Sequence, residues 1–274
     1  MSNFISKETI TRLLKDVKHI IKNPLTDNGI YYIHDDTDLL KGYALIIGPE
    51  DTPYYGGNYF FELNYPFDYP HTPPKVTYCT NGDEVRFNPN LYKCGKVCIS
   101  LLNTWRGEQW TSCQSISTVL LTLCTLLCKD PLLNEPGILK THTDMKNYTD
   151  IIEYSNINVA ICDIISKKPN VYKIFFENFG PFTKENFIKN YDKILSFAEK
   201  KKIEFINKPV LITGLYGMRI KIDYEKVIEK LIEIKFLLVH RCFRKLFKIY
   251  KLSKFAGNFI FIKNALLIFY TIYK

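Results

Sequence analysis

Asn88-Pro89-Asn90 ends eight positions before Cys98, which lies in the run Gly95-Lys96-Val97-Cys98-Ile99-Ser100-Leu101-Leu102. An amide donor beside a thiol is the minimum equipment for acyl transfer through a thioester, because the thiolate attacks the carbonyl and the amide stabilises the oxyanion. Residues 79–114 around this stretch have no regular period and predict a long ordered loop. Loops of this length in a compact domain are usually functional. The sequence therefore indicates a cysteine-based site in this loop.

The residues before the loop predict one helix followed by a meander of four strands. Ser6 has the chemistry of a helix N-cap, and apolar residues recur at helical spacing over about 7–22, before Pro24. Short β-branched and aromatic runs, separated by Gly and Pro, then predict antiparallel strands. These runs lie at 30–33, 43–47, 59–63 and 76–78.

The residues after the loop predict helices, which makes the expected fold class α+β. Apolar residues predict a largely buried helix at 115–128, and a second helix fits 145–167. A helix at 171–179 is expected to break at Gly180-Pro181, and apolar residues over 187–198 define another. Asp223 can cap a last helix. We expect a core domain at 4–167, a helical extension at 168–239 and a tail at 240–274.

The net charge of +9 invites a nucleic-acid interpretation, but the excess lies in the tail. Residues 241–274 contain eight Lys or Arg and no acidic residue, so the remainder holds 29 basic and 28 acidic side chains. A balanced body has no general excess with which to hold phosphates, and we expect no nucleic-acid partner. Eight cysteines without dense spacing fit a reducing compartment, and residues 1–5 do not begin a signal peptide. The expected location is cytoplasmic.

Further motifs stand in register with the Asn-Pro-Asn and Cys98 spacing. Tyr54-Tyr55-Gly56-Gly57 precedes the third strand, and Tyr69-Pro70-His71-Thr72-Pro73-Pro74-Lys75-Val76 leads into the fourth. Trp110 and Ser115-Ile116-Ser117 open the next helix. This combination resembles the ubiquitin-conjugating enzymes over about residues 4–167. It looks closest to the large members related to the enzyme charged by the alternative ubiquitin-activating enzyme, which also continue past the core with extra helices.

The resemblance implies roles for three site residues. Cys98 matches the cysteine that receives the C-terminus of ubiquitin, or of a related modifier, as a thioester before its transfer to a lysine. Asn90 matches the asparagine that stabilises the oxyanion or holds the active-site loop in shape. Glu135, in Asn134-Glu135-Pro136, sits where the family often has an acidic residue that orients the incoming amine. A solvated turn carboxylate is the alternative for Glu135.

Three positions depart from the family pattern. Asn88 stands where the motif usually begins with His, so the structural role of that His must be met differently. His71 falls where many members have a Phe that inserts into ubiquitin ligases. Thr111-Ser112-Cys113 replaces a frequent Ser-Pro-Ala. The last two differences put in doubt whether this chain binds the ubiquitin ligases that family members usually bind.

The resemblance also implies partners. These are the modifier, a ubiquitin-activating enzyme, a ubiquitin ligase and protein substrates. The candidate contacts to the activating enzyme or ligase are Arg12, Lys15, Lys18, His71 and Ser112, although a basic helix face is often simply solvated. No cofactor is expected on this chain, because ATP is consumed by the activating enzyme. Cys124 and Cys128 lie four apart on an apolar helix, which favours core packing over metal binding.

Two other classes of function stay open at this point. A non-catalytic adaptor of the same fold would bind ubiquitin or ligases, but such variants typically lack the cysteine. A membrane-tethered interaction module would depend on the tail alone. There, residues 240–252 look like a basic amphipathic helix, and residues 255–273 are mainly apolar and approach the length of a membrane span. Lys263 at the middle of this stretch weakens that interpretation, and a helix packed on the domain or an unstructured end are the alternatives.

Overall fold

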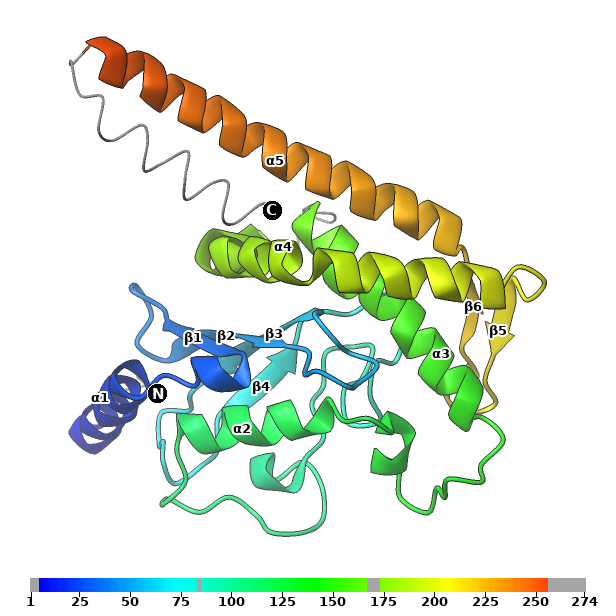
Figure 1. The fold of residues 1–274 in the computed structure, drawn as a ribbon. Coiled ribbons are helices and arrows are strands. Elements are labelled where there is room, and N and C mark those ends of the chain that lie inside the picture. The colour runs from blue at the N-terminus through cyan, green and yellow to red at the C-terminus, as the bar shows by residue number, and fades with distance from the viewer. Residues whose placement is uncertain (1–4, 83–84, 167–172, 256–274) are drawn as a thin grey trace. The chain divides into compact units, whose positions relative to one another are not determined.

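The computed structural model describes residues 5–82, 85–166 and 173–255, with side chains described up to residue 240 except that of Lys173 (Figure 1). The chain divides into two compact units, residues 1–228 and residues 229–274. Each unit is described by itself below. The predicted domain boundaries at 167/168 and 239/240 stay predictions.

The first helix, α1 (Lys7–Lys22), confirms the predicted N-terminal helix. The Ser6 side chain accepts a hydrogen bond from the Thr9 amide at 3.0 Å, and Asn23 caps the other end. Such a cap satisfies an amide that has no partner inside the helix and contributes about 1 kcal/mol. The buried side of the helix carries Leu13, Val17 and Ile20.

The four predicted strands are confirmed, with bounds that differ by up to two residues. They are β1 (Ile30–His34), β2 (Lys41–Ile47), β3 (Asn58–Asn64) and β4 (Lys75–Tyr78). Each strand pairs antiparallel with the next, in the order β1-β2-β3-β4. Because side chains alternate across a strand, this register gives the sheet two buried faces. Tyr43, Leu45 and Phe60 point to one face, and Ala44, Ile46 and Phe61 point to the other.

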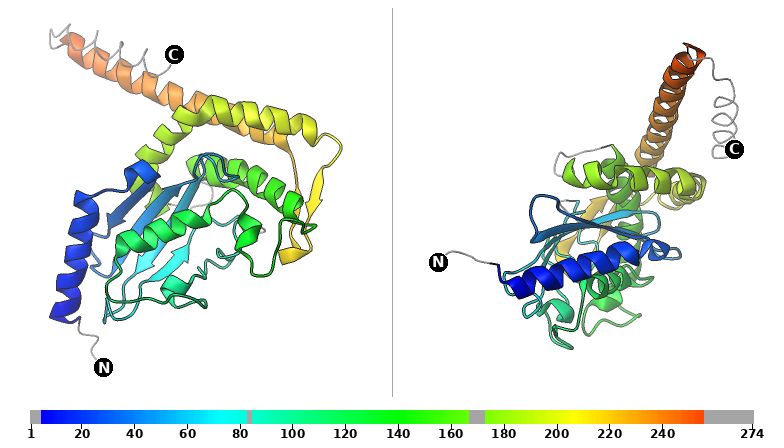
Figure 2. Two further views of the ribbon diagram at one scale, coloured as in Figure 1. Left: turned by 60° about the horizontal axis from the view of Figure 1, so that its bottom comes forward. Right: turned by 90° about the vertical axis from the view of Figure 1, so that its left-hand side faces the viewer.

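Helices cover both faces of the sheet (Figures 1 and 2). On one side lies α2 (Ile116–Leu126), which is capped by a reciprocal pair of hydrogen bonds between Ser115 and Thr118. On the other side lie α3 (Met145–Ser155) and α4 (Lys173–Glu204). From α3 the chain continues as a π-helix over Asn156–Asp163, within the predicted helix 145–167. The face of Tyr43 and Leu45 packs against Ile164, Phe175 and Phe179.

The prediction that Gly180-Pro181 would break a helix is wrong. The helix α4 runs from Lys173 to Glu204 with Pro181 inside it. An internal proline costs about 3 kcal/mol. Phe179 and Phe187, on either side of the proline, are both fully buried. Burying each such ring contributes about 1.5–3 kcal/mol, so together they offset the cost of the proline.

The extension contains a hairpin that the sequence did not predict, in addition to the helices. Its strands are β5 (Val210–Ile212) and β6 (Arg219–Lys221), joined through a 3-10 turn at Leu215–Gly217. Strands of three residues are too short for an alternating pattern to stand out in a sequence. The hairpin lies beside α3 (Figure 1).

The last helix, α5 (Tyr224–Phe255), begins where predicted. Asp223 accepts a hydrogen bond from the Lys226 amide at 3.0 Å, which confirms it as the cap. The helix continues through residue 240, so the predicted basic helix of the tail is a continuation of α5 and not a separate element. The apolar stretch at 256–273 lies outside the described residues. Within the described part of the chain, no helix is both long enough and apolar enough to cross a membrane.

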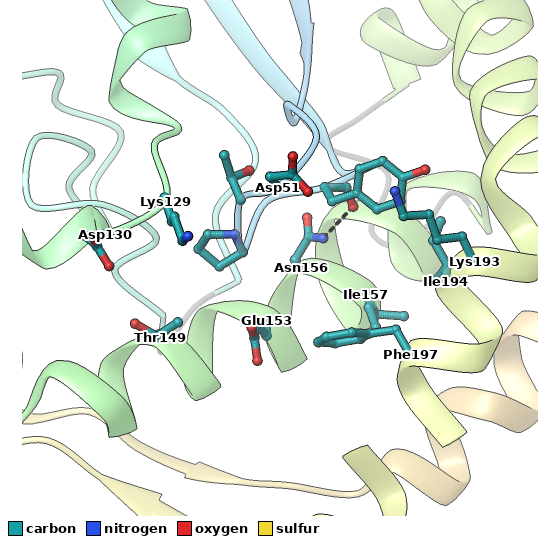
Figure 3. Close-up of a pocket in the computed structure, with 13 residues that line it drawn as sticks. Asp51, Lys129, Asp130, Thr149, Glu153, Asn156, Ile157, Lys193, Ile194 and Phe197 are labelled. Carbon is teal, nitrogen blue, oxygen red and sulfur yellow. Dashed lines mark hydrogen bonds between the residues drawn. The ribbon is translucent and has the colours of Figure 1, made fainter. Parts of the chain in front are cut away.

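The extension is attached to the core through polar contacts between α3 and α4. Lys201 of α4 lies 3.0 Å from the Asp150 carboxylate and 2.7 Å from that of Glu153, and its side chain is 12% exposed. Burial raises the pKa of Glu153, and the Lys201 ammonium opposes that rise. Nearby, the Asn156 amide donates to the Tyr55 carbonyl at 2.9 Å, at the edge of a pocket of about 400 Å³ (Figure 3). This pocket carries both acidic and basic side chains.

We expect Lys201→Met to lower the free energy of unfolding by about 2–3 kcal/mol, because it leaves two poorly solvated carboxylates without their shared cation. The cost falls below the roughly 3–5 kcal/mol typical of broken buried pairs because Asp150 keeps Lys146, at 2.8 Å. Urea unfolding of the full chain measures the change.

The matched control is Lys202→Met on the same helix. Lys202 pairs with Glu225 at 2.9 Å, but both side chains are largely exposed, so its loss should cost at most about 0.5 kcal/mol. Equal losses in the two variants would contradict a special role for Lys201.

Candidate active site

The site is organised around Asn88, whose side chain is fully buried. Its amide nitrogen donates to the Leu126 carbonyl at 2.7 Å and to the Tyr54 hydroxyl at 3.2 Å. Its amide oxygen accepts from the Asn90 amide at 2.9 Å and from the Asn134 side chain at 3.4 Å. One side chain therefore ties the Asn-Pro-Asn motif to the end of α2 and to the segment that carries Glu135. That these contacts replace those of the usual His stays a prediction.

Asn90 and Cys98 are joined by two hydrogen bonds of opposite direction. The Cys98 amide donates to the Asn90 carbonyl at 2.9 Å. The Asn90 side chain donates to the Cys98 carbonyl at 2.6 Å. The structure thus brings together two of the three predicted catalytic residues, and the side-chain amide of Asn90 holds the backbone of the cysteine in place.

Thr104 holds the other side of Cys98, and the sequence did not single it out. Its hydroxyl accepts from the Ile99 amide at 2.9 Å, and its carbonyl accepts from the Cys98 sulfur at 3.0 Å. The turn that returns the chain to Cys98 passes through Asn103, which adopts φ 57° and accepts from the Trp110 amide at 2.9 Å. Short polar side chains such as Asn tolerate this left-handed conformation, which is the local signal that could have revealed the turn.

Cys98 is only 4% exposed. A cleft of about 670 Å³ lies beside it, lined by residues 72–77, 94–97 and 102–104. This lining includes Val97, which precedes Cys98, and Thr104, which contacts the sulfur. Cys98 itself is buried and does not line the cleft, but its sequence neighbour Val97 and its hydrogen-bond partner Thr104 do.

Glu135 lies at the end of a 3-10 turn, Pro131–Asn134, next to the same motif. Its neighbour Asn134 donates to the Asn88 side chain and, at 3.3 Å, to the Leu126 carbonyl. The Glu135 carboxylate is half-buried and accepts a hydrogen bond from the Tyr216 hydroxyl. The predicted residue is therefore close to the motif, but it is held by a tyrosine from the extension.

Arg86 and two tyrosines complete the surroundings of the motif. The Arg86 guanidinium donates to the Pro89 carbonyl and lies 3.7 Å from the centre of the Tyr92 ring and 4.2 Å from that of Tyr216. Burial, followed by the contact with Glu135, raises the pKa of Tyr216. The Tyr216 hydroxyl therefore stays protonated and remains a donor to Glu135. Among the described residues, no group of three or more His, Cys, Asp or Glu gathers as a metal site.

The predicted partner-contact residues fall on α1 and the two loops beside it. The Arg12 guanidinium donates to the carbonyls of Ser112 and Gln114 and pairs with Asp16 at 3.0 Å. His71 is exposed, and its ring lies 3.6 Å from the carboxylate of Glu8 on α1. Lys15 and Lys18 are exposed on α1. The structure brings these five positions to one region, and their role as contacts stays a prediction.

A model of the family described as ubiquitin-conjugating enzyme matches residues 12–170. Since this is more than half of the chain, the chain belongs to the ubiquitin-conjugating enzyme family. The expected family and its α+β fold are thereby confirmed.

Known relatives agree with this assignment. Ubiquitin-conjugating enzyme E2 Z of Danio rerio is 43% identical over 166 residues, which cover 60% of this chain and 50% of the relative. The Homo sapiens protein of the same name is 43% identical over 164 residues, covering 59% and 46%. The chain spans about half the length of the curated relatives it matches. The structure of human ubiquitin-conjugating enzyme E2 G1 is 33% identical, with a TM-score of 0.39 over 44% of this chain and 94% of that one.

We expect Asn88→Ala to lower the free energy of unfolding by about 2 kcal/mol, because it leaves the Asn90 amide without its partner and the Leu126 carbonyl with only the weaker bond from Asn134, at 3.3 Å. Urea unfolding measures the loss. Asn64→Ala is the matched control, since Asn64 makes one partly exposed bond to Glu62 at 2.9 Å and should cost at most about 0.5 kcal/mol. A loss at Asn88 no larger than at Asn64 would contradict its place at the centre of the site.

Proposed function

We propose that this chain accepts ubiquitin, or a related modifier, from an activating enzyme as a thioester on Cys98 and passes it to a lysine of a protein substrate. The observation that carries the proposal is the pair of hydrogen bonds between Asn90 and Cys98. They place an amide donor beside the only cysteine that stands in the family motif. Membership of the ubiquitin-conjugating family supports the same chemistry.

The proposed reaction has two acyl transfers. In the first, the Cys98 thiolate attacks the modifier's C-terminal carbonyl, a carbon–sulfur bond forms on Cys98, and the thiol of the activating enzyme leaves. In the second, a lysine amine attacks the same carbonyl, an amide forms, the amine gives up a proton, and the Cys98 thiolate leaves. A carboxylate close to the attacking amine orients it and helps it to lose the proton, and Glu135 is the candidate.

The Asn90 side chain can serve both roles that the resemblance implies. An Asn amide carries two N–H donors, and one of them bonds to the Cys98 carbonyl. The second donor has no hydrogen-bond partner among the described residues, so it is available for an oxyanion that forms at the thioester carbon. Holding the loop and stabilising the oxyanion are therefore compatible tasks for this side chain.

The expected partners follow from the family: a modifier, an activating enzyme and a ligase. The region of Arg12, Lys15 and Lys18 on α1, with His71 and Ser112 beside it, is the proposed surface for the activating enzyme and the ligase. The alternative of a non-catalytic adaptor would leave Cys98 without a task, and its polar surroundings argue against that alternative.

We expect a ubiquitin adduct that a reducing agent removes when the full chain is incubated with activating enzymes, ATP and ubiquitin. The alternative activating enzyme is tested beside the usual one. Cys98→Ala should form no adduct, and Cys98→Ser should form one that resists reduction, because an oxygen ester replaces the thioester. Cys94→Ala and Cys113→Ala, at exposed cysteines, should charge normally. An adduct that survives in Cys98→Ala would sink the assignment.

We expect Asn90→Ala to charge but to discharge to free lysine about 100-fold more slowly, the usual cost of losing one oxyanion donor. Single-turnover discharge from the charged protein measures the rate, with Asn64→Ala as the control. If Asn90 only held the loop, charging and alkylation of Cys98 would change as much as discharge. A rate of discharge equal to that of the unmodified chain would overturn the oxyanion role.

A further inference from the structure

The turn between β5 and β6 is fixed on the core by polar contacts with α3. Asp144 accepts from the Gly214 amide at 3.2 Å and from the Leu215 amide at 2.8 Å. The Asn147 side chain donates to the Ile212 carbonyl at 2.9 Å. Both carboxylate oxygens of Asp144 are thereby used to hold one turn of the extension. The position of Tyr216, which follows directly, is consequently set by the core.

Tyr216 has an unfavourable backbone conformation for a tyrosine. Its φ is 64° and its ψ is 1°, and the next residue, Gly217, has φ 57°. A glycine at 216 would meet this requirement without strain. A strained residue persists only where its surroundings over-determine it, and such residues gather at functional sites. The strained backbone at Tyr216 therefore points to a role for its side chain.

The two ends of that side chain contact two different parts of the candidate site. The hydroxyl donates to the Glu135 carboxylate, and the ring lies 4.2 Å from the Arg86 guanidinium. Arg86 in turn donates to the Pro89 carbonyl, inside the Asn88-Pro89-Asn90 motif. The backbone of Arg86 is held too, because its amide donates to the Met218 sulfur at 3.3 Å. One turn of the extension thus reaches both the carboxylate and the loop of Cys98.

We propose that Tyr216 is a positioning residue for the transfer step, orienting Glu135 toward the incoming lysine and holding Arg86 against the loop of Asn90 and Cys98. This inference rests on the proposed function and adds to it a role for the extension. Tyr216 touches neither the thioester nor the lysine. The effect of its hydroxyl passes through Glu135, so it concerns acceptors that need a carboxylate beside them. Charging of Cys98 uses no such acceptor and is independent of this hydroxyl, whereas the ring acts on the loop of Cys98 through Arg86.

The test uses three variants of the full chain, each charged on Cys98 and then discharged. Tyr216→Phe removes the hydroxyl and keeps the ring over Arg86. Tyr216→Gly removes both contacts while relieving the backbone, so that a loss of folding does not follow from strain. Tyr55→Phe is the control, because it removes a tyrosine hydrogen bond between core and extension, to Asn190 at 2.7 Å, away from the site. Discharge is followed with lysine and with hydroxylamine, which is uncharged at neutral pH and needs no carboxylate.

Charging should be unchanged in Tyr216→Phe and Tyr55→Phe, and slower in Tyr216→Gly, which releases Arg86 from the ring that holds it against the loop of Cys98. Discharge to lysine should slow about tenfold in Tyr216→Phe, as expected for the loss of a hydrogen bond to a charged group, and further in Tyr216→Gly. Discharge to hydroxylamine should stay within about twofold in Tyr216→Phe. In a chain that already carries Glu135→Gln, adding Tyr216→Phe should slow the discharge to lysine by less than about twofold, because the two residues act as one unit.

If Tyr216→Phe slowed discharge to lysine and to hydroxylamine equally, or did not slow discharge to lysine, the proposal would be overturned. The same holds if the slowing in the double variant with Glu135→Gln equals the product of the two single effects. If the unmodified chain forms no thioester, the proposed function fails, and amide hydrogen exchange decides on Tyr216 separately. Faster exchange at Asn90 and Cys98 in Tyr216→Gly than in Tyr55→Phe would support its hold on the loop, and equal exchange would refute it.

Discussion

The buried amide of Asn88 joins its own Asn-Pro-Asn motif to Tyr54, Leu126 and Asn134, which are distant in the chain, and the site depends on this one group. A fully buried amide must find partners for its donors and its acceptor, since each unpaired group costs about 1–3 kcal/mol. Asn88 finds them in Leu126, Tyr54, Asn90 and Asn134. A neutral imidazole has one donor and one acceptor, so it could not make the same set of contacts. The change from His to Asn thus alters which segments the motif can hold together.

Much of the fold could be predicted because its signals are local. The cap at Ser6, the apolar spacing of α1 and α2, and the β-branched runs between Gly and Pro each act within a few residues. The loop over residues 79–114 could be predicted because its residues follow neither the helical nor the strand period. The spacing of Asn90 and Cys98 was also local, although the two hydrogen bonds that join them required the fold.

The features that were missed depend on contacts between distant residues. Pro181 lies inside α4 because Phe179 and Phe187 are buried, and that burial is not visible in a local window. The bond from Tyr216 to Glu135 joins residues 81 positions apart. No sequence pattern near Tyr216 or near Glu135 predicts this contact. Thr104 is a different case, because Cys98 and Ile99 are only six and five positions away, but an isolated threonine in a loop gives no sign that it will hold the Cys98 segment.

The extension therefore takes part in building the site as well as covering the sheet. Residues that the family pattern places in the core, Arg86 and Glu135, complete their contacts with Tyr216 from the extension. The coupling is direct, because the planar Arg86 guanidinium lies against both the Tyr92 ring, at 3.7 Å, and the Tyr216 ring, at 4.2 Å. Arg86 also donates to the Pro89 carbonyl. A movement of the turn that carries Tyr216 would therefore be transmitted to the loop of Cys98 through the Arg86 side chain. A family member with only the core would have to position the same carboxylate by other means, and in that respect this chain differs from a minimal conjugating enzyme.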